Sequence, residues 1–119
     1  MSERCRVLIA DDNMRARFGL RALLALRPEI EIAGDAADGW EAVQRVRDSQ
    51  PDVVLMDARM PQMDGLEATR QIKDHWPQVR IVVVSMYASH RAEALAAGAD
   101  AFLVKGCPAG ELLAAIMEC

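Results

Sequence analysis

Short runs of apolar residues alternate along this chain with longer segments in which apolar residues recur at helical spacing. The clearest run is Val53–Met56, a continuous stretch with β-branched residues. A run of that length is typical of a strand buried on both faces. Similar runs predict strands at 5–10, 80–84 and 101–104, whereas the alternation at 30–33 predicts a half-buried strand ended by Gly34.

Five helices are predicted between and after these strands, each with apolar residues on one face. Their limits follow from caps and breakers: Asp12 or Asn13 before the first and Pro28 after it, Asp38 before the second, Leu66 and Pro77 around the third, residues 89–97 and Gly98 for the fourth, and Pro108 opening the fifth. The apolar positions that mark them are Phe18, Leu20, Leu23, Leu24, Trp40, Val43, Val46, Leu66, Thr69, Ile72, Trp76, Leu112, Leu113, Ile116 and Met117.

A strand followed by a helix, repeated five times, indicates an α/β fold with a parallel sheet covered by helices on both faces. Right-handed crossovers leave few topologies for such a chain. The doubly wound, flavodoxin-like order 2-1-3-4-5 fits best, because it puts the half-buried second strand at an edge. We therefore expect one five-stranded domain over residues 1–119.

Composition narrows the class of protein. With 52% hydrophobic and 27% charged residues, the chain is ordinary for a globular domain, and its net charge of -4 gives no nucleic-acid footprint. No apolar run approaches the roughly 20 residues of a membrane span, and Met1–Arg4 lacks the apolar core of a signal peptide. We expect a cytoplasmic chain that binds neither membrane nor nucleic acid. The irregular spacing of Cys5, Cys107 and Cys119 predicts free thiols.

Polar residues with useful chemistry follow the buried strands. Asp11 and Asp12 follow the first, Asp57 the third, Ser85 the fourth and Lys105 the fifth. Because all these ends meet at one edge of a parallel sheet, the side chains are expected to share a pocket. Closely packed carboxylates resist ionisation unless a cation joins them, and Mg²⁺ suits a few carboxylates plus water and phosphate. A carboxylate beside Mg²⁺ can accept a phosphoryl group.

These residues, and the phrase Leu55–Gly65, resemble the receiver domain of two-component response regulators over essentially the whole chain. The resemblance implies that Asp57 is the phosphoacceptor and that the metal is Mg²⁺ or Mn²⁺. It assigns the metal to Asp57, to Asp12 directly, to Asp11 through water and to the backbone carbonyl of Arg59. It implies that Lys105 binds the phosphoryl group and that Ser85 and Phe102 occupy the two switch positions.

Two stretches, 84–87 and 105–113, are more specifically similar to receivers that precede a LuxR-type helix-turn-helix. We expect no effector domain in this chain. Two positions depart from the family pattern. Gly106 stands where many relatives have a proline, often cis, so no cis bond is predicted, and Ala58 is smaller than the usual aliphatic.

The resemblance implies a signalling switch that a sensor histidine kinase phosphorylates and that relays the change to a partner or to a DNA-binding effector domain in transcription regulation. Its only catalysis would be its own phosphorylation and dephosphorylation. The face made by the fourth helix, fifth strand and fifth helix is expected to form the homodimer or partner surface. We expect movement of residues 86–88 to open space for the Phe102 ring, and the alanine-rich fourth helix to shift easily.

Other functions are weighed against this one. A phosphatase of the haloacid dehalogenase type also uses an aspartyl nucleophile, but it needs a second Asp where this chain has Arg59. A flavin-binding module needs a phosphate loop in place of Asp11 and Asp12. A receiver-like interaction module without phosphorylation stays open.

Four kinds of side chain outside the acid set are also assigned. His75 and His90 are expected at the surface, and Trp40 and Trp76 as packing anchors. Arg59 and Tyr87 flank the pocket, where they are predicted to screen a phosphoryl group from water.

Overall fold

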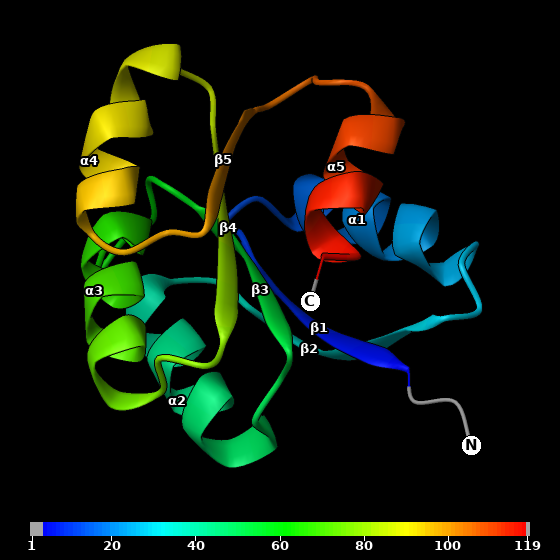
Figure 1. Ribbon diagram of the computed structural model, residues 1–119, viewed down its shortest axis with the longest axis horizontal. Coiled ribbons are helices and arrows are strands. Elements are labelled where there is room, and N and C mark those ends of the chain that lie inside the picture. The colour runs from blue at the N-terminus through cyan, green and yellow to red at the C-terminus, as the bar shows by residue number, and fades with distance from the viewer. Residues whose placement is uncertain (1–3, 119) are drawn as a thin grey trace.

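The computed structural model describes residues 4–118 and has the predicted α/β architecture (Figure 1). Five parallel strands form one sheet in the order β2-β1-β3-β4-β5, which confirms the predicted topology. Strands and helices alternate as β1 (Cys5–Ala10), α1 (Met14–Ala25), β2 (Ile30–Ala36), α2 (Gly39–Ser49), β3 (Val53–Asp57), α3 (Gly65–His75), β4 (Arg80–Ser85), the 3₁₀ turn η1 (Ala88–His90), α4 (Arg91–Ala96), β5 (Ala101–Val104) and α5 (Ala109–Ile116). The predictions for residues 1–3 and for Cys119 lie outside the described residues.

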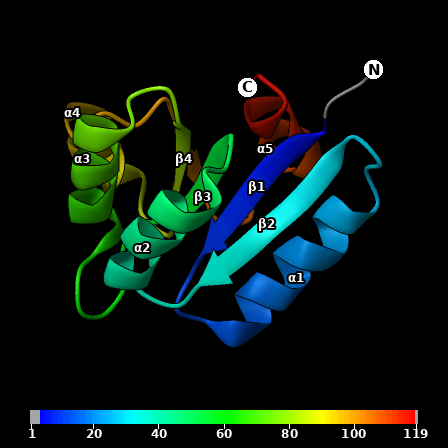
Figure 2. The same ribbon diagram turned by 90° about the horizontal axis from the view of Figure 1, so that it is seen from below.

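The helices cover the sheet in two layers. Figures 1 and 2 show α1 and α5 on one face and α2, α3 and α4 on the other. Alternate residues of β1 supply the two cores, because successive side chains of a strand point to opposite faces: Val7 packs with Leu24 and Ile116, and Leu8 packs on the side of Val46. All five residues of β3 are buried, so the prediction of a strand covered on both faces is confirmed. Within residues 4–118, no helix is long and apolar enough to cross a membrane.

Side-chain caps start three helices directly after the carboxyl edge of the sheet. The carboxylates or amide oxygen of Asn13, Asp38 and Asp64 accept hydrogen bonds from backbone N–H groups of the first helical turn, at 3.0, 2.7 and 2.9 Å. These caps fix where α1, α2 and α3 leave the loops around the site. Of the two residues considered for the first cap, Asn13 is the one used.

Three predictions about the fold are wrong. Gly34 does not end β2; the strand continues to Ala36, with a bulge where Val7 pairs with Ile32 and Leu8 with Gly34. Trp40 is 56% exposed, since Ala42, about 200° further round α2, takes the buried position. Phe18 is 62% exposed for the same reason, because it lies about 200° before Leu20 on α1.

The predictions for Trp76, His75 and Cys107 are confirmed, whereas the fourth helix differs in length from its prediction. Trp76 is partly buried against the core, and His75 is exposed. Cys107 has a free thiol, while the buried Cys5 Sγ lies 4.0 Å from the Ile116 carbonyl oxygen. The fourth helix is shorter than predicted, because residues 88–90 form a 3₁₀ turn and only Arg91–Ala96 is α-helical. Gly98 ends it with a φ of 107°, as predicted for a C-cap.

Gly65 provides a test of how α3 is fixed against the site. Its N–H donates to the Ala58 carbonyl at 2.9 Å, and a methyl group at this position would collide with the Asp57 carbonyl oxygen. Gly65→Ala is therefore expected to lower the free energy of unfolding by about 3 kcal/mol in urea denaturation. Gly110→Ala is the control, because a methyl group there meets open space and should stabilise α5 by up to about 1 kcal/mol. Equal stability of the Gly65 variant and the wild type would contradict this packing.

Candidate functional site

Acidic side chains gather at the carboxyl ends of β1 and β3. Asp11 and Asp12 follow β1, and Asp57 is the last residue of β3. Because the two strands are neighbours, carboxylate oxygens of the three residues lie within 4.8 Å of one another. The ammonium of Lys105, which follows β5, lies 3.2 Å from Asp11 Oδ2 and 3.4 Å from Asp57 Oδ2. The structure thus brings together four of the residues singled out in the sequence.

The three acids differ in accessibility. Asp11 and Asp57 are 3% and 8% exposed, whereas Asp12 faces solvent. Asp11 is held firmly, since its Oδ1 accepts the Asn13 N–H at 2.8 Å and its carbonyl accepts from Arg17 Nη1 at 2.6 Å. The sequence analysis did not single out Arg17, whose Nε also lies 3.7 Å from Asp35 Oδ2 on β2. The site therefore has two fixed, buried carboxylates and one that an incoming ion can reach.

Burial and the neighbouring charges shift the pKa values of Asp57 and Lys105. Burial first, and then the neighbouring Asp11 carboxylate, raises the pKa of Asp57 to about 6, against the opposing effects of Lys105 and the Arg59 N–H. Burial alone would lower the pKa of Lys105, but the Asp57 and Asp11 carboxylates outweigh it and hold that pKa above its usual value. Lys105 is therefore a permanent cation, and Asp57 is a carboxylate whose charge is only partly compensated.

The donor set fits a hard divalent cation. Carboxylate oxygens within reach of one another, with an excess of negative charge over Lys105, are ligands that suit Mg²⁺. On the outer side of Asp12, an open hollow of about 530 Å³ reaches the loop after β3 and is lined by Asp12, Arg59, Met60, Pro61, Gln62 and Asp64. Such a hollow leaves room for the water that Mg²⁺ usually keeps.

Ser85 lies at the end of β4, but its hydroxyl is bonded away from the acids. Its Oγ lies 2.6 Å from Nδ1 of His90 and accepts the Tyr87 N–H at 3.1 Å. His90 is only 8% exposed, so the prediction of a surface histidine is wrong. The 3₁₀ turn folds His90 back over the end of β4, where its imidazole forms a hydrogen bond with the buried Ser85 hydroxyl. The one sequence signal was a histidine five residues after a strand-end serine, across a short polar turn.

The Arg59 and Tyr87 side chains, which flank the pocket, make their contacts outside the acid cluster. Arg59 is exposed, with its guanidinium 3.9 Å from Asp64, and Tyr87 is 62% exposed, with its ring edge-on to that of His90 at 5.6 Å. Phe102 is 7% exposed inside the core. The prediction that movement of residues 86–88 opens space for its ring is therefore wrong, because the ring is already inside while Ser85 bonds His90.

The loop after Lys105 explains one departure from the family pattern. Gly106 has a φ of 90°, which proline cannot adopt because its ring holds φ near -65°. Residues 4–118 contain no cis peptide bond. The chain therefore turns away from Lys105 by a left-handed glycine.

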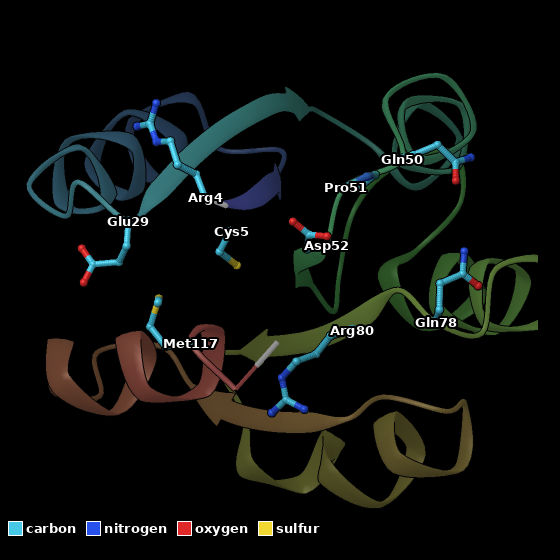
Figure 3. A pocket seen from close by; sticks show the side chains of 9 residues that line it. All are labelled: Arg4, Cys5, Glu29, Gln50, Pro51, Asp52, Gln78, Arg80 and Met117. Atoms are coloured by element: carbon cyan, nitrogen blue, oxygen red, sulfur yellow. The ribbon is translucent and has the colours of Figure 1, made fainter. Parts of the chain in front are cut away.

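Two cavities lie near the sheet edges. An apolar one of about 340 Å³ opens between α1 and α5 beside Asp57 and Lys105. The other, of about 490 Å³, lies at the opposite edge, where Cys5, Asp52 and Met117 point inward (Figure 3). Its two guanidinium groups, from Arg4 and Arg80, each donate to backbone carbonyls. This second cavity is remote from the acid cluster and has no comparable chemistry.

The raised pKa of Asp57 makes a prediction about stability. An unfolded Asp has a pKa of about 3.9, so the native state holds the proton more tightly and loses stability as pH rises from about 4 to 6. Asp57→Asn removes this loss. We expect the variant to be more stable than the wild type by about 1–3 kcal/mol at pH 7.5 and equally stable near pH 4, in urea denaturation without divalent cations.

Asp74→Asn, on the exposed surface of α3, is the control and should change stability by less than about 0.5 kcal/mol at both pH values. A less stable Asp57→Asn protein at pH 7.5 would mean that the Lys105 pair outweighs burial.

Known proteins share this architecture and are similar in sequence. The model of the response regulator receiver domain family matches residues 7–117 of this chain. The chain is 39% identical to YhcZ, a transcriptional regulatory protein of Bacillus subtilis (strain 168), over 91% of this chain and 51% of that protein. It is 36% identical to the transcriptional regulatory protein DegU of Brevibacillus brevis, over 93% and 48%. The chain therefore spans about half the length of these curated relatives.

Among solved structures, the receiver domain of the putative response regulator NarL from Mycobacterium tuberculosis superposes with a TM-score of 0.92 at 31% identity, covering 98% of this chain and 96% of that one. Fold, acid cluster and sequence agree, and receiver domains bind Mg²⁺ at such a cluster of Asp residues. The chain belongs to the response regulator receiver domains of two-component systems.

Proposed function

We propose that Asp57 is the phosphoacceptor of a signalling switch that works with Mg²⁺ or Mn²⁺. One observation carries the proposal: the Asp57 carboxylate is buried at a strand end, 3.4 Å from Lys105 and grouped with Asp11 and Asp12. A solvated surface acid has none of these neighbours. With a pKa of about 6, Asp57 is mostly ionised at neutral pH and so keeps a lone pair for attack.

In the proposed reaction, an Asp57 carboxylate oxygen attacks the phosphorus of a donor. A new oxygen–phosphorus bond forms while the bond from phosphorus to the donor breaks, and the donor leaves with that electron pair. Lys105 faces the same carboxylate and supplies positive charge for the oxygens of the transferred group. A bound divalent cation would neutralise charge on those oxygens.

The other roles follow the family resemblance. Asp12 and Asp57 would hold the metal directly, Asp11 through water, and the backbone carbonyl of Arg59 would complete the protein ligands. Ser85 would donate to a phosphoryl oxygen. Screening of the phosphoryl group by the Arg59 and Tyr87 side chains stays a prediction; both are exposed.

A sensor histidine kinase is the proposed phosphoryl donor. The conformational change that follows phosphorylation is proposed to act through the face made by α4, β5 and α5, which would contact a second copy or an effector domain that regulates transcription. Two exposed aliphatic side chains support this face: Leu95 on α4 is 45% exposed and Val104 on β5 is 37% exposed. Catalysis is confined to the domain's own phosphorylation and dephosphorylation.

Acetyl phosphate with Mg²⁺ tests the acceptor. Intact mass spectrometry is expected to find one added phosphoryl group on the wild type and on the Asp74→Asn control, and none on Asp57→Asn. Acid should slow the reaction, because protonation removes the attacking lone pair, and bound Mg²⁺ should move this loss to a pH below the metal-free pKa of about 6. Undiminished modification of the Asp57 variant would refute the assignment.

Metal binding tests the acid cluster separately. In a titration with Mg²⁺ followed by backbone NMR, resonances near Asp11, Asp12, Asp57 and Arg59 should shift in the wild type. Asp12→Ala should weaken the affinity about 10-fold or more, since a carboxylate ligand is lost and Lys105 remains. Asp38→Ala, which removes a helix cap rather than a cluster acid, should keep the affinity. Equal affinity in the Asp12 variant would contradict the proposed ligand set.

A further inference from the structure

The hydroxyl of Ser85 has two partners, and both come from the turn that leads into α4. Ser85 is 1% exposed, and its Oγ contacts the Tyr87 N–H at 3.1 Å and His90 Nδ1 at 2.6 Å. His90 also closes the turn through its own N–H, which donates to the Tyr87 carbonyl at 3.1 Å. Strand end, turn and histidine thus form one small hydrogen-bonded unit.

The hydrogen bonds fix which way the hydroxyl proton points. A serine hydroxyl has one proton to donate and two lone pairs, and the Tyr87 N–H occupies one lone pair. Among residues 4–118, His90 Nδ1 is the acceptor within hydrogen-bond distance of this oxygen. If Nδ1 were the donor, the buried hydroxyl proton would have no protein partner, which is costly. We therefore assign Ser85 Oγ–H as the donor to Nδ1, which puts the proton of a neutral His90 on Nε2.

We infer that His90 is a positioning residue: its imidazole holds the hydroxyl proton of Ser85, and Ser85 must give up this bond to donate to a phosphoryl group on Asp57. This inference rests on the proposed phosphorylation of Asp57. It makes His90 a competitor of the phosphoryl group for one proton. Removing the imidazole nitrogen should therefore make the phosphoryl-bound arrangement easier to reach.

The competition extends to α4 because His90 is its N-cap residue. The helix has six residues, of which Ala94 is the buried one, and the Ser85–His90 bond ties the start of this helix to the end of β4. Breaking this bond loosens the start of α4. By linkage, a partner that holds the start of α4 in place restrains Ser85 by the same free energy.

The ring nitrogens of His90 give a direct test without any ligand. Long-range ¹H–¹⁵N spectra of the wild type are expected to show Nδ1 as a hydrogen-bonded acceptor and Nε2 as protonated. Ser85→Ala should shift Nδ1 markedly and leave the ring nitrogens of the exposed His75 unchanged. A His90 Nδ1 signal that Ser85→Ala does not move would overturn the inference, whether or not Asp57 accepts a phosphoryl group.

A double-mutant cycle tests the competition, with beryllofluoride and Mg²⁺ as the phosphoryl mimic. His90→Phe keeps an apolar ring and removes the nitrogen, so it should tighten beryllofluoride binding by about 2- to 10-fold, the worth of one hydrogen bond. The same change should have no effect in the Ser85→Ala background, and His75→Phe should have none in either. Should His90→Phe not fold, His90→Leu takes its place in the cycle.

Two results would overturn the inference: weaker binding by the His90 variant, or an equal effect with and without the Ser85 hydroxyl. Both would mark His90 as a packing residue only. Intact mass after acetyl phosphate, on the same samples, separates this failure from that of the proposed function. A wild type that takes up no phosphoryl group rejects Asp57 as acceptor, whereas normal uptake with an unaltered cycle rejects only the role of His90.

Discussion

The ammonium of Lys105, set between the carboxylates of Asp11 and Asp57, is the contact on which the site depends. One cation cannot balance two buried acids and a third beside them, so the cluster keeps an excess of negative charge. Burial first, and then the Asp11 carboxylate, raises the pKa of Asp57 to about 6 despite this contact. Buried charges rarely add to stability, because desolvation offsets much of their attraction. Because the arrangement adds little to stability, it supports the proposed role of Asp57 as a phosphoacceptor beside a cation.

The register of the parallel strands, rather than the course of the loops, places the acidic side chains next to one another. Parallel pairing sets Ala10 beside Met56 and Asp57 beside Val84, so the residues after β1 and at the end of β3 meet without adjustment. Backbone bonds from Ala58 to Val84 and from Lys105 to Ser85 continue the same alignment past the strands. The acid cluster therefore lies at the ends of paired strands, and under the proposed function the conformational response would fall to the turn and short helix that follow Ser85.

Most of this could be predicted from the sequence, since a buried strand leaves a continuous apolar run and parallel topology sends every strand end to one edge. The gathering of Asp11, Asp57 and Lys105 needed nothing more. His90 could not be placed in this way, because its burial depends on a 3₁₀ turn that folds back on Ser85, and no periodicity marks such a turn. The prediction for Trp40 failed although the helical spacing was clear. A large apolar residue at that spacing need not pack against the sheet when a small alanine, here Ala42, fits closer.

The irregularity of β2 bears on how the domain meets other molecules. An edge strand presents unpaired backbone groups that can recruit a strand from another chain. Here the bulge at Gly34 breaks the regular spacing of those groups, and Glu31 and Asp35 place ion-paired charges along the same strand. The opposite edge, β5, has only four residues. Both borders are thus poor templates for the addition of a strand from another molecule, so the domain resists aggregation by sheet extension.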